Sequence, residues 1–592
     1  MTGGPESSLP GTDNIDEDPG DSSTHAFLRR VSTHLSLVGK VHPREVTREQ
    51  ESLDDDAPDD SVLLLPERHQ ASEYVDCFFS HLNATYRYLP RAKMDRLVGQ
   101  IYTNTAAAMK DDATLGLFLS VVSCGCVWMP SWKGHDLVVC RDRANLMLRT
   151  AAKKLRKAST KLPPTMVLLQ ARFAYCQALI ACHKYDSAWL ALGKTIRLSQ
   201  IIGLGRRRIE QAPLDQFEWR GLFWSIFMAD RYLAMFLGRP FGISAHDISI
   251  PLPEEPPLSL DSELGPEERT LVPGTVGHIN ILEIASRIMS TLYGARPLLA
   301  AEKESCVISF ESELEAWLEK TPSFFHSDQM SDKGVFYSVS WLFKRQQRTI
   351  RSAYCFTKML LYRSFLLDDL TNRSIGTPSS EQPQLSEYSH KCRSAAVAMA
   401  ELAAEFSSDE TYNPVFWGTS HSIFCAIAVL VVSFLLFDDR SQLEPIIENA
   451  MKAHMRLTMP NSPQRQRLLE VSKHTLGSPN ALYVATHPPN DERVLDNALG
   501  NGTGAQQYAN EIWRLADAPP MRRGPSQSIA PPASLSAVDL LNGPTTLSIA
   551  DGQAISEMSL DTATADLESG LQMMFDIGFD KVTFGGDFSG LY

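Results

Sequence analysis

Helical periodicity constrains the fold of this chain more than any other feature. Throughout residues 71–476, apolar side chains recur at intervals of three and four residues, and alternation with a period of two is nearly absent. Glycine and proline are largely confined to breaks between these segments. The pattern predicts an all-α fold with one large multi-helix bundle or array. No repeat of fixed period occurs, so a regular solenoid is not indicated.

The most regular helical segments are separated by a proline-rich stretch at residues 251–273, which predicts a solvated loop between an earlier and a later bundle. The predicted helices are 142–157, 165–180, 187–202, 217–237, 279–293, 342–367, 389–406 and 415–437. Residues 423–437 form the longest apolar run. This run is shorter than the roughly 20 residues that span a bilayer, so it predicts a buried core helix, with a membrane span as the alternative.

The two ends of the chain differ in composition from its helical centre. Residues 1–70 are acidic and rich in Pro, Gly, Ser and Asp, which predicts disorder interrupted by one short amphipathic segment at 26–41. Residues 477–550 are predicted to be a linker. The final segment, 551–592, interleaves acidic residues with large apolar ones, a composition typical of an activation segment that a partner's apolar groove captures. Its main candidate contacts are Met573, Met574, Phe575, Phe579, Phe584 and Phe588. The alternative is an acidic tail that only solubilises the chain or folds back on it.

Charge and cysteine usage restrict the class of protein. The net charge of -14 argues against a chain that wraps DNA or binds RNA without specificity. The start of the chain lacks the basic and apolar regions of a secretory signal, and the 10 cysteines are scattered through apolar helical segments. We therefore expect reduced, buried thiols in an intracellular protein.

The most specific pattern lies at residues 185–253, where two predicted helices are followed by a proline-flanked turn. Its key positions are Trp189, Gly193, Arg197, Gly203, Leu204, Glu218, Arg220, Phe223, Trp224, Asp230, Arg231, Gly238, Arg239 and Pro240. The tryptophans are expected on apolar faces, with each indole N–H requiring a partner. Asp230 and Arg231 lie among apolar residues, which predicts that at least one of the two charges is semi-buried and paired. Glu218 is expected near a helix start, and Gly238 is expected to end the helix with a positive φ. These residues are interpreted as scaffold.

These positions resemble the signature of the fungal-specific transcription factor domain, the regulatory region of zinc-cluster transcription factors. Residues 78–97 also resemble the family's opening helix and its Tyr-x-Tyr-Leu-Pro entry. One departure is that Trp219 and Gly221 flank a single Arg220 where the family usually has a run of arginines. Because glycine lowers helix propensity by about 1 kcal/mol, we expect this stretch to pack differently.

The resemblance implies a nuclear transcriptional regulator that controls metabolic genes, with a secondary-metabolite gene cluster as one candidate target. The alternative is a co-regulator deficient in DNA binding that dimerises with a complete family member. Implied partners are promoter DNA, reached directly or through a partner, a homo- or heterodimer mate, transcription co-activators and a small-molecule effector. No membrane contact is implied.

The family reads DNA through six cysteines that hold two zinc ions, and this chain contains no Cys-x-x-Cys pair. Cys124, Cys126 and Cys140 form the nearest cluster but lack the spacing and the basic context. We therefore expect no metal or other cofactor in this chain, and zinc only if a missing upstream cluster exists. Basic clusters near residues 153–157, 206–208 and 344–348 are interpreted as solvated helix faces, with nuclear import or phosphate contact as alternatives.

Catalytic motifs are not evident. No phosphate-binding loop, nucleophile elbow or His-Glu-x-x-His zinc motif occurs, and the glycine-rich stretch at residues 500–504 follows a polar segment rather than a strand. The histidines are dispersed along the chain. The sequence therefore predicts that this protein is not an enzyme. A helical enzyme that binds a small molecule is the weaker third class.

Overall fold

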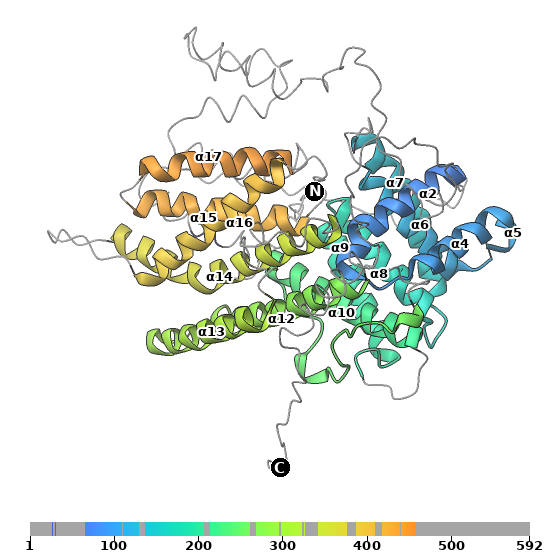
Figure 1. The fold of residues 1–592 in the computed structure, drawn as a ribbon, viewed down its shortest axis with the longest axis horizontal. Coiled ribbons are helices and arrows are strands. Elements are labelled where there is room, and N and C mark those ends of the chain that lie inside the picture. The colour runs from blue at the N-terminus through green and yellow to red at the C-terminus, as the bar shows by residue number, and fades with distance from the viewer. Residues whose placement is uncertain are drawn as a thin grey trace, which may run out of the picture. The chain divides into compact units, whose positions relative to one another are not determined.

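The computed structural model describes residues 27, 30, 65–108, 110–129, 137–206, 213–260, 268–294, 298–322, 325, 341–375, 386–408, 417–437 and 440–457. Helices make up nearly all of this part, and it contains no strand (Figure 1). The all-α prediction is therefore confirmed. The predicted linker and activation segment lie outside the described residues, as does nearly all of the acidic region 1–70.

The early helices are α2 (Arg68–Phe78), α3 (Ala84–Tyr86), α4 (Arg91–Thr103), α5 (Thr105–Ala108), α6 (Asp112–Val127), α7 (Leu137–Ala158), α8 (Met166–Ala181), α9 (Tyr185–Ile201) and α10 (Pro213–Leu237). A π-helical turn at Phe79–Asn83 joins α2 to α3. Helix α6 packs against α2, α7 and α8, while α9 packs against both α8 and α10. These contacts form the earlier bundle.

The later helices are α12 (Glu268–Leu292), α13 (Ala300–Lys320), α14 (Trp341–Ile375), α15 (Glu387–Ser408), α16 (Trp417–Leu436) and α17 (Arg440–Arg456). Helices α14 to α17 pack on one another, and α12 contacts both α14 and α10 (Figure 1). Helix α12 therefore connects the two bundles, which share one continuous hydrophobic core.

Three helices lie inside the bundles, and their side chains are apolar around most of the helix circumference. Almost every residue of α6 and α8 is buried. Helix α16 contains an 18-residue window, Trp417–Phe434, that is long and apolar enough to cross a membrane, but 89% of that window is buried inside the protein. A helix with apolar residues all round is expected in a protein core as well as in a bilayer. The long apolar run therefore forms a core helix here.

Side-chain caps explain where two core helices begin. Asp111 precedes α6 and accepts hydrogen bonds from the backbone N–H groups of Ala113 and Thr114. Thr165 precedes α8, and its hydroxyl accepts a hydrogen bond from the N–H of Leu168 at 3.2 Å. Each cap satisfies N–H groups that have no partner within the helix. The predicted start of this second helix at residue 165 coincides with its cap.

The predicted loop at residues 251–273 is wrong from residue 268 on, and residues 261–267 lie outside the described ones. Residues 251–257 are non-helical and Leu258–Leu260 form a single 3-10 turn, but α12 begins at Glu268 and includes Pro273. Proline removes one backbone donor near a helix start. Leu271, Val272 and Ile279 are all buried, and their burial offsets that loss.

Helices α6 and α2 approach closely at Gly125. A Cβ atom at this position would lie 1.8 Å from the carbonyl oxygen of Tyr74 and 2.8 Å from the Tyr74 Cα. Both neighbours are backbone atoms, so no side-chain rotation could relieve the overlap. The glycine between Cys124 and Cys126 is therefore required for helix packing.

Candidate functional site

The first half of the signature fixes the end of α9. Gly203 has φ +66°, which allows the chain to leave the helix, and Leu204 is fully buried directly after it. The Leu204 carbonyl accepts a hydrogen bond from Trp219 Nε1 at 2.8 Å, so this turn is attached to α10. Trp219, a departure from the family pattern, therefore has a structural role that the sequence did not reveal.

Trp189 is half-buried rather than enclosed in the core, and no hydrogen bond of its indole N–H occurs among the described residues. The guanidinium of Arg239 lies over its ring, 4.8 Å from the ring centroid. The same guanidinium pairs with Asp186 at 2.6 Å. The signature arginine therefore connects the end of α10 to the start of α9.

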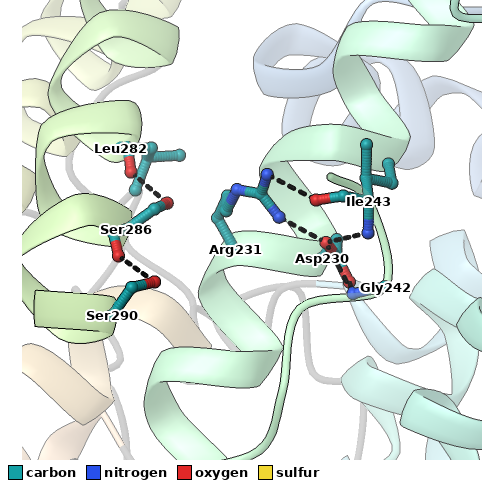
Figure 2. A network of polar contacts seen from close by, with 7 residues as sticks. All are labelled: Asp230, Arg231, Gly242, Ile243, Leu282, Ser286 and Ser290. Atoms are coloured by element: carbon teal, nitrogen blue, oxygen red, sulfur yellow. Dashed lines mark hydrogen bonds and ion pairs between the residues drawn. The ribbon is translucent and has the colours of Figure 1, made fainter. Parts of the chain in front are cut away.

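The central feature of the signature is a buried ion pair. Asp230 and Arg231 are each 3% exposed, and Arg231 Nη1 donates to Asp230 Oδ2 at 2.7 Å (Figure 2). The Asp230 carboxylate also accepts hydrogen bonds from the backbone N–H groups of Gly242 at 2.9 Å and Ile243 at 3.2 Å. Arg231 Nη2 donates to the Ile243 carbonyl at 2.8 Å. The prediction that at least one of these charges is buried and paired is confirmed, and the contacts attach the loop after α10 to the helix itself.

Burial governs the electrostatics of this pair. Desolvation raises the pKa of Asp230, although Arg231 and the two backbone N–H groups favour its charged form. Desolvation likewise lowers the pKa of Arg231. The guanidinium lies between the rings of Phe227 and Phe241, at 4.3 and 4.5 Å from their centroids. No water-exposed face remains on which this pair could act chemically, so its role is structural.

Glu218 lies in the interior of α10, not in its first turn, because the helix begins at Pro213. The expected interaction with the helix dipole is therefore wrong. Glu218 is buried, and its carboxylate accepts hydrogen bonds from Lys93 Nζ at 2.5 Å and Gln170 Nε2 at 2.8 Å. These contacts join α10 to α4 and α8. Partners this far apart in the chain have no local sequence signal.

Gly221 allows α10 to approach the turn between α3 and α4. A Cβ at this position would lie 2.5 Å from the carbonyl oxygen of Arg87, which itself has φ +56°. Ser225, one helical turn later, donates a hydrogen bond to the Tyr86 carbonyl. The departure from the family's arginine run therefore coincides with a close backbone contact.

Two signature residues reach a hollow at the protein surface. Trp224 Nε1 donates to the Pro251 carbonyl at 2.8 Å, and Arg220 pairs with Glu254 at 2.7 Å. Both line a cavity of about 100 Å³, together with residues 253–257. Phe223 faces away from it and is buried against Gly205. The signature thus supplies one wall of this hollow.

The remaining signature positions have simple structural placements. Gly238 has φ +70° directly after the last residue of α10, as predicted, and Pro240 follows in the non-helical loop. Gly193 lies on an exposed face of α9, with nothing within 4 Å of a Cβ added there. Arg197 is exposed and donates to Gln200 at 2.9 Å. Met573, Met574, Phe575, Phe579, Phe584 and Phe588 lie outside the described residues.

Three histidines, two of them buried and one half-buried, predict a steep loss of stability in acid. Burial lowers the pKa of His81 to about 3 and the pKa of His183 and His278 to about 4, from an ordinary value of 6.5. The unfolded chain therefore takes up protons below about pH 6.5, while the folded chain does not until about pH 4. Stability is fully present above pH 6.5 and falls by up to about 1.4 kcal/mol per pH unit per histidine as the pH drops through this window.

The measurement is the denaturant midpoint as a function of pH. We expect His278→Gln to reduce the slope between pH 6.5 and 4 relative to the parent chain. An unchanged slope in the His278 variant would contradict the assignment.

The cysteine cluster has the geometry of core packing. Cys126 Sγ donates to the Cys140 carbonyl at 3.3 Å, and Cys124 Sγ donates to the Ala174 carbonyl at 3.4 Å. Burial raises the pKa of Cys124, which disfavours the thiolate that zinc requires. Within the described part of the chain, no group of three or more His, Cys, Asp or Glu side chains is arranged to hold a metal ion.

Comparison with known proteins identifies residues 75–319 as a match to the family described as the fungal specific transcription factor domain. A Saccharomyces cerevisiae protein named provisionally as a transcriptional regulatory protein is 24% identical over 437 residues, covering 68% of this chain and 55% of its own length. Cutinase transcription factor 1 beta of Fusarium vanettenii is 24% identical over 214 residues, covering 35% of this chain and 23% of its own. Activator of stress genes 1 of Saccharomyces cerevisiae is 21% identical over 386 residues, covering 62% and 38%. The chain thus spans at most about half the length of these relatives.

Proposed function

We propose that this protein is a nuclear transcriptional regulator of the zinc-cluster type, because residues 75–319 match the fungal specific transcription factor domain. The family match carries this proposal, and the names of the three relatives, all of which refer to transcription or gene activation, support it. The relatives named for cutinase and stress genes favour metabolic or stress-response genes as the targets, a secondary-metabolite gene cluster among them.

The geometry of the signature favours a role as scaffold rather than as a catalyst. The Asp230–Arg231 pair is enclosed, and Glu218 is occupied by Lys93 and Gln170. A helical body of this kind can regulate by binding partners that shift it between conformations. In this proposal the acidic segment 551–592 recruits co-activators. An effector or a dimer partner bound to the helical body controls whether co-activators can reach that segment.

The second candidate is a co-regulator that reaches promoters only through a complete family member. The given sequence contains no Cys-x-x-Cys pair, and both candidates are compatible with that. Both candidates place the protein at promoter DNA, either by direct contact or through a partner.

Chromatin occupancy of the epitope-tagged full-length chain in its native cell tests the proposal. We expect sharp promoter peaks, and we expect transcripts of the occupied genes to fall severalfold in a strain that lacks residues 551–592 while occupancy persists. The apolar side chains are expected to carry this effect, because a partner's groove binds them. Replacing Phe575, Phe579 and Phe584 with alanine should therefore reproduce it.

The control is a strain that lacks residues 518–536 of the proposed linker, in which transcripts should stay near normal. Binding of the purified chain to the occupied sequences then separates the two candidates, since only the first binds DNA unaided. Absence of promoter peaks from cells that contain the protein would refute both.

A further inference from the structure

Arg172 on α8 is a buried cation that lacks a carboxylate partner. The residue is 7% exposed, and no Asp or Glu pairs with it among the described residues. Burial lowers the pKa of its guanidinium to about 10. The buried Arg231, by contrast, has Asp230 beside it. Because a buried charge without an opposite charge keeps its desolvation cost, an anion added next to Arg172 would be stabilising.

The guanidinium of Arg172 is directed at the hydroxyl of Ser159. Its Nε and Nη2 atoms donate to Ser159 Oγ at 2.8 and 2.6 Å. Nη2 also donates to the Leu155 carbonyl at 2.9 Å. The edge formed by Nε and Nη2 is a fork that suits two oxygens of one anion, as in arginine–phosphate pairs. Here both donors converge on one neutral oxygen, so the fork has the geometry for an anion that the unmodified serine does not supply.

Ser159 lies at the protein surface, directly after the last residue of α7. It is half-buried, and the next residues, 160–163, are all exposed. Its hydroxyl donates to the Leu155 carbonyl at 2.6 Å. That carbonyl also accepts from the backbone N–H of Ser159 at 3.0 Å and from Arg172. Loss of the hydroxyl proton through modification of Ser159 Oγ therefore leaves no backbone acceptor unsatisfied.

The sequence before Ser159 is basic. Arg156 lies three residues and Lys157 two residues before the serine, within the basic cluster at 153–157. Protein kinases select their substrates partly by the charge pattern around the acceptor hydroxyl, and this pattern suits a kinase with an acidic substrate groove. A kinase reads these side chains in an extended segment. Because helix ends fray, recognition takes place once the last turn of α7 has opened, whatever contacts the basic side chains make in the helix.

We propose that Ser159 is a phosphorylation site and that Arg172 binds the phosphate. A protein kinase transfers the γ-phosphoryl group of ATP to Ser159 Oγ. The new O–P bond forms, the bond from the γ-phosphorus to the β–γ bridging oxygen breaks, ADP leaves, and the hydroxyl proton passes to the catalytic base of the kinase. The phosphate, with a charge of about −1.5 to −2 at pH 7, attaches the end of α7 to α8. Only the effect on transcription rests on the proposed function.

Recognition is tested by incubating the purified full-length chain with ATP and the catalytic subunit of cAMP-dependent protein kinase, which prefers arginine before the acceptor serine. Mass spectrometry maps the phosphate. We expect phosphate on Ser159, at an initial rate at least about 10-fold lower in Arg156→Gln. The control Lys161→Gln removes a basic residue on the other side of the serine and should leave the rate nearly unchanged. Absence of phosphate from Ser159, or equal rates in the two variants, would overturn the proposed recognition.

The ion pair is tested on a full-length chain in which phosphoserine is encoded at position 159, so that no other serine is modified. The phosphate should raise the thermal midpoint by at least about 2 °C, and it should give no increase in Arg172→Gln. Its second pKa, ordinarily about 6, should be lowered beside the guanidinium and should return towards that value in Arg172→Gln. Phosphorus NMR of the folded chain measures this pKa, so the result does not depend on the stability of the variant.

The matched control is phosphoserine encoded in place of Thr160, which adds the same charge one residue further along. The Thr160 side chain is exposed and donates to the Lys157 carbonyl at 2.8 Å. The helix dipole disfavours a phosphate at the end of α7 in both chains, so only the contact with Arg172 should produce a gain in stability. Equal midpoints in the two phosphorylated chains, or an unchanged phosphate pKa in Arg172→Gln, would overturn the ion pair. Promoter occupancy is measured separately, so failure of this site and failure of the proposed function are distinguishable.

Discussion

Replacement of Gly125 with alanine should destabilise the fold by at least about 3 kcal/mol. The added methyl group would lie 1.8 Å from the Tyr74 carbonyl oxygen and 2.4 Å from its carbonyl carbon, so α6 and α2 would have to separate. Overpacking usually costs about 1–3 kcal/mol, and this case lies at or above the upper end because the atoms that overlap belong to the backbone. The loss should appear as a lower thermal midpoint of the full-length chain, measured by circular dichroism.

Gly193→Ala is the matched control for this experiment. Gly193 also lies in the middle of a helix, but nothing is within 4 Å of its added Cβ. Alanine is favoured over glycine in a helix by about 1 kcal/mol, so this variant should be as stable as the parent or slightly more stable. If both variants melted at the same temperature, the close contact between α6 and α2 would be refuted.

Asp230→Asn should cost about 3–5 kcal/mol of folding free energy. The asparagine preserves the shape of the side chain but leaves the Arg231 charge buried, since both residues are 3% exposed. Removing one member of a buried ion pair is more damaging than removing both, because the partner keeps its desolvation cost. The double variant Asp230→Leu/Arg231→Met should therefore recover part of the loss. Urea denaturation followed by tryptophan fluorescence measures both.

Glu448→Gln provides the comparison for Asp230→Asn, because Glu448 pairs with Lys452 at 3.8 Å on the exposed surface. Exposed pairs contribute only about 0–1 kcal/mol, so this change should be nearly silent. Equal losses in the two single variants would contradict a dominant role for burial. A double variant less stable than Asp230→Asn would contradict the proposed cost of the unpaired charge.

The helices were the most predictable level of this structure, because their signal is local. The predicted segment 165–180 corresponds to α8 and the predicted segment 187–202 to α9, each within two residues of its observed bounds. The predicted start at residue 279 missed the first turns of α12, because Pro273 suggested a loop. Tertiary packing of the buried residues Leu271 and Val272 overrides that local preference.

The contacts within the candidate site were less predictable, since they join distant parts of the chain. The charged sequence pair Asp230–Arg231 among apolar residues was enough to predict its burial. By contrast, the bond between Lys93 and Glu218 joins residues on two helices with no shared periodicity. The bonds from Arg172 to Ser159 were equally hidden, because an arginine in an apolar helix has no pattern that identifies its partner.

The junction of the two bundles has a consequence for synthesis of the chain. Phe236 at the end of α10 packs against Phe356 of α14 and against Trp417 of α16, with ring centroids 5.3 and 5.2 Å apart. At about 5–20 residues per second, the ribosome delivers these late partners on the order of tens of seconds after Phe236 has emerged. During that interval the apolar face of α10 is open to solvent and to chaperones. The nascent chain therefore completes its core only after α16 is released, well beyond residues 75–319, which match the fungal specific transcription factor domain.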